Sequence, residues 1–399
     1  MKVLFTTHPA YGHFHPLLPL AGAARAAGHD VAFATSAMFC SVIEEAGFPA
    51  FDAGLEWLES DESTLPDELQ PAPGSSLEAF FAQKFVAATA EPLASGVVAA
   101  ASKWRPDVIV RERTEYGGAL AADALGIPCA AVQVASPSLM TPAFLAEVAR
   151  PYNIAREHLG LPADEGLSAL EDQVVFAFAP PSLHDPTVPL PPNFVSLRPV
   201  ALDATASATL PSWADELGRD RPLVYATLGT IFNNPEYNLP FFPAIMEGLR
   251  DEPVDVVITV GPLVDAASVG APPPNVRVER YVPQSLLFPR CSAVICHGGY
   301  GTLLAAIEYG VPLVVVPFGA DQPINARSVE RLGIGQVVQG DEVTADRMRH
   351  AVRSVLDDPE YRRRVEQVRD DAGRLPATTE AVTELEGIVA RGIEASAPG

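Results

Sequence analysis

The sequence predicts an α/β protein with two doubly wound parallel-sheet domains that face each other across a cleft. Short, nearly continuous apolar runs alternate with amphipathic helical stretches in both halves of the chain. This alternation is typical of parallel strands that are covered by helices on both faces. A proline-dense passage at 180–199 separates the two blocks, and 399 residues suffice for two or three domains. In such sheets, ligands bind outside the carboxyl ends of the strands.

The first block, predicted as a domain over 1–205, begins with a strand close to the first residue. Strands are predicted at 2–7, 30–35, 106–111, 129–134, 174–178 and 194–197, and helices at 17–27, 37–46 and 117–125. Between 51 and 83 the pattern loosens into acidic residues, prolines and aromatics. This segment is either disordered surface or one wall of a binding site, and its aromatic residues (Trp57, Phe80 and Phe81) favour the wall.

The second block, predicted as a domain over 206–377, repeats the alternation. Strands are predicted at 223–228, 254–260, 276–279, 292–296 and 313–316. A last amphipathic helix over about 378–394 follows, within a separate C-terminal segment 378–399.

A glycine-rich turn joins the strand at 292–296 to a helix predicted at 302–309. It reads His297-Gly298-Gly299-Tyr300-Gly301-Thr302. Free backbone N–H groups at a helix start, at the positive end of the helix dipole, bind phosphate readily. Glycines let a bulky anion approach the backbone, and the histidine and threonine can add side-chain donors. The alternative is a tight strand-to-helix turn with a solvated histidine, and the turn alone does not choose between the two.

Charge and composition exclude several classes of partner. The formal net charge is −23 and the isoelectric point is near 4.6, which argues against binding to nucleic acid or to an anionic membrane. Any phosphate site must then act locally, through N–H groups. The four cysteines show no C-x-x-C spacing and are interpreted as small buried apolar residues: Cys40, Cys129, Cys291 and Cys296. We find no signal peptide and no apolar run of membrane-spanning length, so we expect a soluble, cytoplasmic protein.

Three motifs around the glycine turn resemble, in order, the donor-binding signature of nucleotide-sugar glycosyltransferases. They are His-Gly-Gly-x-Gly-Thr from His297, Gly-Val-Pro from Gly310, and Pro-x-x-x-Asp-Gln-x-x-Asn-Ala from Pro317. More narrowly, the chain resembles glycosyltransferase family 1, which includes plant enzymes and bacterial antibiotic and natural-product enzymes of the calicheamicin type. The resemblance implies the GT-B fold, in which two Rossmann-like domains bind acceptor and nucleotide sugar, respectively, and the final helix crosses back to the first domain.

The resemblance also implies a donor site in the second domain. The turn that contains His297, Gly298, Gly299, Gly301 and Thr302 would hold the diphosphate, together with Gly229 and Thr230 after an earlier strand. Tyr281, Val282 and Gln284 match the segment that lies against the nucleobase, with tyrosine in place of the family's tryptophan. Asp321 and Gln322 match the pair that binds sugar hydroxyls.

A general base is expected in the loop after the first strand, where ligands bind. A histidine suits this role because its ordinary pKa lies near neutral pH. His8, His13 and His15 crowd this loop, and spacing does not choose among them. The resemblance indicates His13, because Gly12-His13-x-x-Pro16 matches the family's Gly-His-x-x-Pro, whose histidine deprotonates the acceptor.

A carboxylate that orients the base is expected at Glu112, which directly follows another strand. Many family members have an aspartate at this spacing, so the longer glutamate could alter the geometry. Glu115 is the alternative partner, and pairing of Glu112 with Arg111 or Arg113 is the purely structural alternative.

Taken together, the residues predict an inverting glycosyltransferase that moves a sugar from a dTDP- or UDP-sugar to a hydroxyl of a bulky apolar natural product, with His13 as the base. The expected partners are the nucleotide sugar and the small-molecule acceptor, with no nucleic acid and no membrane; a homodimer is compatible with the sequence. No acidic pair stands at the glycine turn, so no metal and no further cofactor is expected.

Two other classes of protein compete with this interpretation. One is another enzyme on the same fold, such as a nucleotide-sugar epimerase or a sugar phosphorylase; neither needs the His13 loop with its carboxylate, and a phosphorylase would use a lysine for its cofactor, whereas lysines are almost absent. The other is a non-catalytic homologue that serves as a partner protein. The intact His13 and His297 motifs disfavour it.

Overall fold

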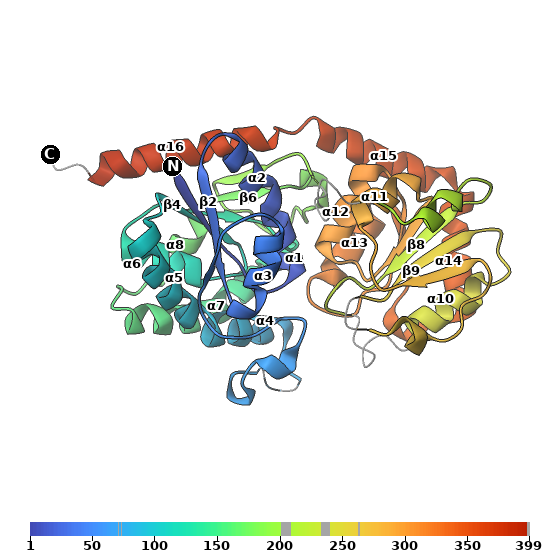
Figure 1. Cartoon of the computed structure of the whole chain (residues 1–399), viewed down its shortest axis with the longest axis horizontal. Coiled ribbons are helices and arrows are strands. Elements are labelled where there is room, and N and C mark those ends of the chain that lie inside the picture. The colour runs from blue at the N-terminus through green and yellow to red at the C-terminus, as the bar shows by residue number, and fades with distance from the viewer. Residues whose placement is uncertain (71, 73, 201–208, 233–239, 262–263, 397–399) are drawn as a thin grey trace. The chain divides into compact units, whose positions relative to one another are not determined.

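Both halves of the chain form a parallel sheet flanked by helices (Figure 1). The structure is a computed structural model that describes residues 1–70, 72, 74–200, 209–232, 240–261 and 264–396. The chain divides into two units. The first contains Met1–Phe178, Pro186–Arg198 and Pro376–Gly399, and the second contains Ala179–Asp185 and Pro199–Leu375. The boundary predicted between 205 and 206 lies outside the described residues.

The sheet of the first unit has seven strands in the order β3-β2-β1-β4-β5-β6-β7, and every pairing is parallel. The strands are β1 (Lys2–Thr6), β2 (Asp30–Thr35), β3 (Ala50–Asp52), β4 (Val108–Glu112), β5 (Cys129–Val132), β6 (Val174–Ala177) and β7 (Phe194–Ser196). Val3, Leu4 and Phe5 of β1 are all fully buried. Helices cover both faces of the sheet, and this is why the strands are apolar without alternation.

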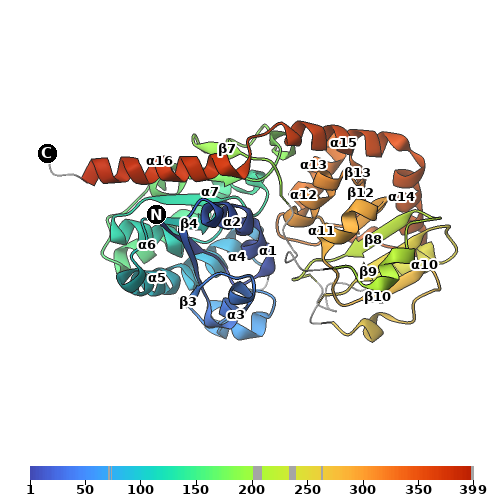
Figure 2. The same ribbon diagram turned by 45° about the horizontal axis from the view of Figure 1, so that its top comes forward.

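Helices of the first unit surround this sheet. They are α1 (Tyr11–Phe14), α2 (Leu18–Ala26), α3 (Ala37–Glu45), α4 (Leu77–Phe81), α5 (Ala90–Trp104), α6 (Gly117–Leu125), α7 (Pro142–His158), α8 (Ser168–Glu171) and α16 (Thr378–Ser396). The last of these, α16, lies along α2, as Figure 2 shows. Ala381, Val382 and Leu385 of α16 are buried in the same core cluster as Leu17 and Leu20. The C-terminal helix thus belongs to the first unit.

The second unit repeats the pattern with the strand order β10-β9-β8-β11-β12-β13, again all parallel. The strands are β8 (Leu223–Thr227), β9 (Asp255–Thr259), β10 (Val276–Glu279), β11 (Ala293–Cys296), β12 (Leu313–Val315) and β13 (Gly335–Val337). The helices are α10 (Phe241–Leu249), α11 (Gln284–Leu287), α12 (Tyr300–Tyr309), α13 (Gln322–Leu332), α14 (Ala345–Asp357) and α15 (Pro359–Gly373).

Two apolar clusters cover the opposite faces of the second sheet. Val294 and Cys296 of β11 belong to the cluster that contains residues of α12, α13 and α15. Ala293 and Ile295 belong to the other cluster, which contains residues of α10 and α14. Successive strand residues point to opposite faces of the sheet, so both faces of β11 must be apolar. The uninterrupted apolar run at 293–296 meets this requirement.

Each sheet has one point at which the strand order reverses. The chain runs outward from β1 to β3 and then returns to place β4 on the other side of β1; it does the same from β8 to β10 and back to β11. The loops after the two central strands therefore diverge to opposite faces and leave room for a ligand at the carboxyl ends. The fold directs attention to the residues after β1 and β4, and to those after β8 and β11.

The structure corrects several boundaries. Strands β3 and β13 were not predicted; each has three residues, too few to show a periodic pattern. Helical turns begin at Tyr11, inside the predicted loop 8–16. Pro16 permits them, because it lies in the first turn of a helical segment, where no N–H is needed. Helix α12 begins at Tyr300 rather than at Thr302. Cys40 and Cys129 are only half-buried.

One helical run contradicts the expectation that no apolar stretch of the chain is long enough to span a membrane. Residues Leu77–Trp104 form 28 continuous helical residues that would pass as a membrane span by length and composition alone. The run combines α4, a π-helical segment at Ala82–Ala88, the turn residue Thr89 and α5. Half of its most apolar stretch is buried in the first unit, where α5 contacts α6 and α7. Core helices of globular domains give the same signal.

A glycine sets the close approach of α5 and α6. A Cβ atom at Gly117, the first residue of α6, would lie 2.6 Å from the carbonyl oxygen of Ala90 and 2.8 Å from the Cβ of Leu93. Both atoms belong to α5 and have little freedom to move away. The two helices can therefore keep this distance only with glycine at 117.

We expect Gly117→Ala to destabilise the protein by ~1–3 kcal/mol, because the added methyl group overpacks a backbone contact. Gly22→Ala in α2 is the matched control: its Cβ would meet no atom within 4 Å, so the better helix former should stabilise by about 0.5–1 kcal/mol. Urea unfolding followed by circular dichroism measures both. Equal stability of the two variants would contradict the α5–α6 contact.

Candidate active site

Strand pairing in the first unit sets His13 and Glu112 side by side. Thr6, the last residue of β1, pairs with Arg111 of β4. The chain continues from β1 into the turn that leads to α1, which contains His13. Glu112 is the last residue of β4 and is fully buried. The two side chains come from the two strands between which the order reverses.

The Glu112 carboxylate holds one nitrogen of His13. His13 Nδ1 lies 2.8 Å from Glu112 Oε1. The other oxygen, Oε2, accepts hydrogen bonds of 2.7 Å from both the backbone N–H and the hydroxyl of Thr114. With both carboxylate oxygens fixed, Glu112 can orient the imidazole and stabilise its protonated form. The side chain makes no ion pair with Arg111 or Arg113 among the described contacts.

The two neighbouring arginines are used elsewhere. Arg111 Nη1 donates to the carbonyl oxygens of Arg113 at 2.7 Å and Glu115 at 2.9 Å. Arg113 Nη1 donates to Gln133 Oε1 at 2.8 Å. Glu115 also has other partners: Thr6 Oγ1 donates to it at 2.5 Å and the N–H of Gly118 at 3.0 Å. Burial raises the pKa of Glu115 to about 7. Of the two predicted carboxylates, Glu112 is therefore the one that contacts His13.

The structure also separates the histidines of this loop. His8 is buried, its Nε2 lies 3.2 Å from the carbonyl oxygen of Thr114, and it stays 3.7 Å from Glu112 Oε1. Its ring contacts Phe85, with ring centroids 4.5 Å apart. Burial lowers the pKa of His8 to about 4. His15 lies beside Tyr11, with ring centroids 5.3 Å apart.

A second carboxylate that sequence reasoning missed faces the other nitrogen of His13. Glu59 Oε2 lies 2.9 Å from His13 Nε2, and the glutamate side chain is only about 9% exposed. Glu59 belongs to the loose acidic segment 51–83, and nothing in its sequence context distinguishes it from Glu56 nearby. This segment is tied to the fold: the N–H of Trp57 donates to Ser36 Oγ at 3.0 Å, and that of Glu59 to the carbonyl oxygen of Pro9 at 3.3 Å.

The charges around His13 shift its titration. Burial opposes protonation, but the Glu59 and Glu112 carboxylates outweigh it and hold the pKa of His13 well above its ordinary value. Burial likewise opposes ionisation of Glu59, yet His13 and Lys84 lower the pKa of Glu59 to about 2. The pKa of Glu112 is also lowered, against its burial, chiefly by His13. Two carboxylates and one imidazolium thus form a buried charged triad.

In the second unit, the glycine turn after β11 has the form of an anion site. Gly298 has φ +86°, and a Cβ there would lie 2.8 Å from Val315 Cγ1. Gly299 caps α12, and no described side chain caps the free N–H groups of the first turn. A Cβ at Gly299 would collide with the ring of His297. Gly301 and Thr302 lie in the first turn, where N–H groups point outward along the helix axis.

His297 is the side chain that turns toward this helix start. It is 7% exposed, and among the described residues its Nδ1 has no hydrogen-bond partner. Burial lowers the pKa of His297 to about 4, so the ring is neutral at pH 7. Gly229, which follows β8, contacts the ring so closely that a Cβ would lie 2.8 Å from His297 Cε1. The ring nitrogen nearest Gly299 at the helix start is Nε2, and a neutral imidazole can donate a hydrogen bond from one of its two nitrogens.

The loop after β12 meets the same turn. Asn325 Nδ2 donates to the carbonyl oxygen of Gly298 at 2.9 Å and to Asp321 Oδ2 at 3.1 Å. Gln322 Oε1 accepts from the N–H groups of Phe318 and Gly319, at 2.8 Å and 3.1 Å. The amide oxygen of Gln322 is therefore used within the loop, and its amide nitrogen is the atom left for a ligand. Sequence reasoning quoted Asn325 within a motif but did not assign it this linking role.

The remaining predicted donor residues follow the strand ends at the same edge. Thr230 is half-buried and comes directly after Gly229, beyond β8. Tyr281 is 51% exposed and Val282 is buried, both beyond the edge strand β10. Gln284 begins α11. Strands β9 and β8 lie between β10 and β11 in the sheet, so two strands separate Tyr281 and Val282 from the glycine turn.

Comparison with known proteins decides the family. A family profile described as "Erythromycin biosynthesis protein CIII-like, C-terminal domain" matches residues 245–388. The 10-deoxymethynolide desosaminyltransferase of Streptomyces venezuelae is 30% identical over 98% of both chains. The 4'-demethylrebeccamycin synthase of Lentzea aerocolonigenes is 28% identical over 97% of this chain and 99% of its own. The chain belongs to the glycosyltransferases of antibiotic biosynthesis.

Solved structures confirm the fold of this glycosyltransferase. SnogD from Streptomyces nogalater matches with a TM-score of 0.78 and 30% identity, over 98% of this chain and 99% of its own. VinC, solved in complex with dTDP, matches with a TM-score of 0.81 and 27% identity, over 98% and 100%. The predicted GT-B fold and the predicted family are therefore both confirmed.

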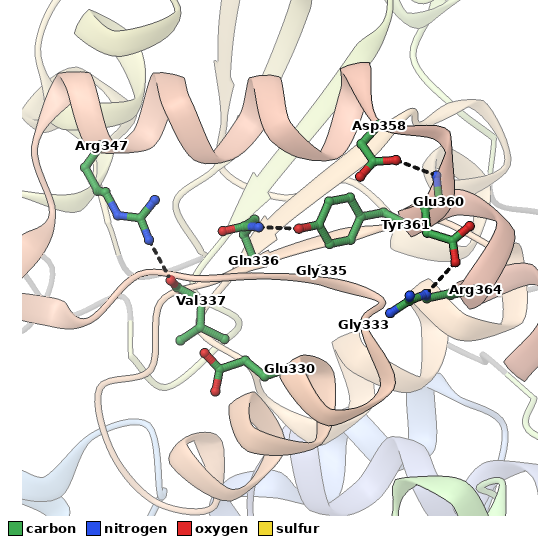
Figure 3. A pocket seen from close by; sticks show the side chains of 10 residues that line it. All are labelled: Glu330, Gly333, Gly335, Gln336, Val337, Arg347, Asp358, Glu360, Tyr361 and Arg364. Carbon is green, nitrogen blue, oxygen red and sulfur yellow. Dashed lines mark hydrogen bonds and ion pairs between the residues drawn. The ribbon is translucent and has the colours of Figure 1, made fainter.

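The glycosyltransferase has a further groove of about 480 Å³ in the second unit, shown in Figure 3. It is lined by residues of α13, β13, α14 and α15, none of which was predicted to bind the donor. Two pairs of its side chains interact: Gln336 Nε2 donates to the hydroxyl of Tyr361, and Arg364 Nε to Glu360 Oε1 at 2.7 Å. Arg347 donates to the carbonyl oxygen of Val337, and Asp358 accepts from the N–H of Glu360, so most of the polar groups in this groove are used within the unit.

The pKa values of two neighbouring histidines of the glycosyltransferase, His8 and His13, should be shifted in opposite directions from the ordinary histidine pKa. Without ligands, we expect the His8 resonance to titrate near pH 4, because burial disfavours its charged form, and the His13 resonance to titrate above pH 6.5, because two carboxylates favour it. Two-dimensional NMR of the histidine Cε1–H groups measures both, with His8→Gln and His13→Gln for assignment. Midpoints near 6.5 for both would contradict the charged triad.

Proposed function

We propose that this glycosyltransferase transfers a sugar from a dTDP- or UDP-sugar to a hydroxyl of a bulky apolar natural product, with inversion at the anomeric carbon and His13 as the general base. The observation that carries the proposal is the 2.8 Å contact of His13 Nδ1 with the buried Glu112. It leaves Nε2 as the nitrogen that can receive a proton. The names of the relatives support the reaction class: a desosaminyltransferase and a structure with bound dTDP.

The reaction is a single displacement. The acceptor oxygen forms a bond to the anomeric carbon while its proton moves to His13 Nε2. The bond from the anomeric carbon to the diphosphate breaks, and the nucleoside diphosphate leaves with the electron pair. One attack from the side opposite the leaving group inverts the carbon. Glu112 stays ionised and stabilises the imidazolium that forms.

The donor diphosphate binds, in this proposal, at the start of α12. The free N–H groups of that turn and the neutral His297 are hydrogen-bond donors, and the helix dipole adds positive potential. Thr230 contributes a hydroxyl from the loop after β8. A chain with net charge −23 offers little long-range attraction to an anion, so these fixed local donors stabilise the leaving group. They make a metal ion unnecessary.

The rest of the donor is held by the flanking loops. The half-exposed ring of Tyr281 offers a face on which a nucleobase can stack, and the backbone of Val282 and the amide of Gln284 can contact its edge. Asp321 and the Gln322 amide nitrogen bind hydroxyls of the sugar. The tie from Asn325 to both Gly298 and Asp321 supports a single rigid surface for phosphate and sugar.

If His13 is the base, His13→Ala should lower turnover by ~100- to 10,000-fold and leave nucleotide affinity nearly unchanged, because the donor binds in the other unit. Steady-state assays with an acceptor found by screening natural products, together with dTDP titrations, measure the two quantities. Turnover at the wild-type level would overturn the assignment and make His8 or His15 the next candidate.

The substitution Glu112→Gln tests, in the same assays, whether Glu112 orients the His13 imidazole. Glutamine keeps the shape but not the charge, so turnover should fall while the unfolding temperature stays near that of the wild type. A collapse of the unfolding temperature would show that Glu112 is a structural residue instead.

The diphosphate site is tested by nucleotide binding. Gly299→Val should abolish dTDP and UDP binding, because the side chain displaces His297 and covers the first-turn N–H groups. His297→Ala should cost about 1–3 kcal/mol through the lost hydrogen bond. Gly373→Val is the control, since a Cβ at the end of α15 meets no atom within 4 Å.

Titration calorimetry with and without Mg²⁺, at low and physiological salt, measures these affinities. Binding should weaken only modestly with salt, because partly buried dipoles are screened less than surface charges. A requirement for Mg²⁺, or unchanged binding by Gly299→Val, would show that the anion is not held at this helix start.

A further inference from the structure

The nitrogen that the proposed mechanism requires is already covered in this structure. His13 Nε2 lies 2.9 Å from Glu59 Oε2, which is the distance at which an acceptor hydroxyl would have to lie to give up its proton. The acceptor oxygen and the Glu59 oxygen cannot occupy one position. Catalysis by His13 therefore requires that the Glu59 carboxylate move away.

Glu59 is built into the fold rather than placed there by chance. It is buried, and its backbone N–H donates to the carbonyl oxygen of Pro9, in the turn that leads to His13. The buried Lys84 lies over the ring of Trp57, 5.7 Å from the centroid, and its charge acts on Glu59. The Glu59 carboxylate is thus held near His13 by the backbone hydrogen bond of Glu59 and by the positive charges of Lys84 and of His13 itself.

Proton geometry determines the state of the pair. If Nδ1 of a neutral His13 donates to Glu112, its Nε2 carries only a lone pair. A lone pair and a carboxylate oxygen at 2.9 Å repel each other, so one of the two groups must carry a proton; because the pKa of Glu59 is lowered, the proton is on His13 Nε2. With both ring nitrogens protonated, the imidazole is a cation flanked by two anions, and it has no free basic site.

The contact of His13 with Glu59 is less well aligned as a hydrogen bond than its contact with Glu112. Among the described residues, Glu59 Oε2 has no aligned hydrogen bond although His13 Nε2 is near. Glu112 accepts two hydrogen bonds from Thr114 in addition to its contact with His13. Glu59 is therefore held on His13 mainly by charge, and a ligand that fills its place can displace it.

Resting on the function proposed above, we propose that Glu59 is a positioning residue that occupies the acceptor's place on His13 and keeps the base protonated until an acceptor displaces it. When the acceptor enters, Glu59 withdraws and the Nε2 proton of His13 passes to solvent. The freed nitrogen then takes the acceptor's proton during transfer. Without an acceptor, water finds no base, so the nucleotide sugar is protected from hydrolysis.

The other charged groups near His13 do not produce this effect. Glu112 faces Nδ1 and stays in place throughout the reaction. The His8 ring lies edge-on to His13 at 5.4 Å between centroids, and its burial keeps it neutral. Lys84 acts on the pair through Glu59, and Glu115 is bonded to Thr6 and Gly118. Among the described groups, Glu59 is the one whose removal uncovers Nε2.

The test replaces Glu59 by glutamine and follows His13 directly. In the ligand-free Glu59→Gln protein, NMR titration should show a lower His13 midpoint than in the wild type, because one of two carboxylates that favour the cation is lost. Glu56→Gln, an exposed glutamate three residues away, should leave the midpoint unchanged. An unchanged His13 midpoint in Glu59→Gln would overturn the proposal, whatever the enzyme's activity.

A second readout is hydrolysis of dTDP-glucose without acceptor, measured as a pH profile. The rate should rise with pH as His13 loses its proton, and Glu59→Gln should move this rise to lower pH. At pH 6.5 we expect about 10- to 100-fold faster hydrolysis than in the wild type, with the two rates converging at high pH. Equal profiles, or a loss that is the same at every pH, would assign Glu59 a merely structural role.

Two further variants separate the possible failures. If Glu59→Gln does not fold, Glu59→Asp keeps the charge but shortens the arm, and it should lower the His13 midpoint less, because the carboxylate then lies farther from Nε2. His13→Ala combined with Glu59→Gln should remove the gain in hydrolysis. If the gain persists without His13, the base of the proposed function is wrong; if the NMR midpoint fails to move, the role of Glu59 is wrong.

Discussion

The reversal of strand order between β1 and β4, and again between β8 and β11, is the constraint on which both candidate sites depend. At such a point two adjacent strands send their chains to opposite faces of the sheet, and the backbone there is open. In the first unit the opening receives the buried glutamate that ends β4 and the histidine that follows β1. In the second unit it receives the glycine turn after β11 and the loop after β8.

The two sites solve opposite electrostatic problems. The first surrounds a histidine with negative charge: buried carboxylates lie on both sides of His13 and favour its protonated form. In the proposed function, the second receives a diphosphate in a chain with net charge −23. There a neutral histidine and the start of α12 take the place of a basic patch, because local dipoles attract an anion without a net positive charge.

Much of this arrangement could be predicted from the sequence because it follows from local pattern. The strands of both sheets are short apolar runs, and the turn at 297–302 has Gly298 where φ is positive and Gly299 where a Cβ would collide with His297. Glu112 could be placed at a strand end from the apolar run before it. Strands β3 and β13 were missed because three residues are too few to show a periodic pattern of apolar side chains.

Glu59 and Gln322 show why the rest could not be predicted. Glu59 lies 46 residues after His13, in a segment without a regular period, and its backbone hydrogen bond to Pro9 ties that segment to the turn before the imidazole. Gln322 matches a motif, yet its oxygen caps the loop's own N–H groups. Contacts of this kind depend on the tertiary path of a loop, which residue spacing does not encode.

The different supports of the two glutamates explain how one histidine can be both fixed and available. Glu112 stands on a central strand, and both of its oxygens accept hydrogen bonds, so moving it would leave a buried carboxylate unpaired at a high cost. Glu59 stands on an irregular segment, and its Oε2 makes no aligned hydrogen bond with the described residues. Its withdrawal costs mainly the attraction between opposite charges, part of which water and Lys84 can replace. The rigid carboxylate sets the direction in which His13 points, and the displaceable one sets when its second nitrogen is free.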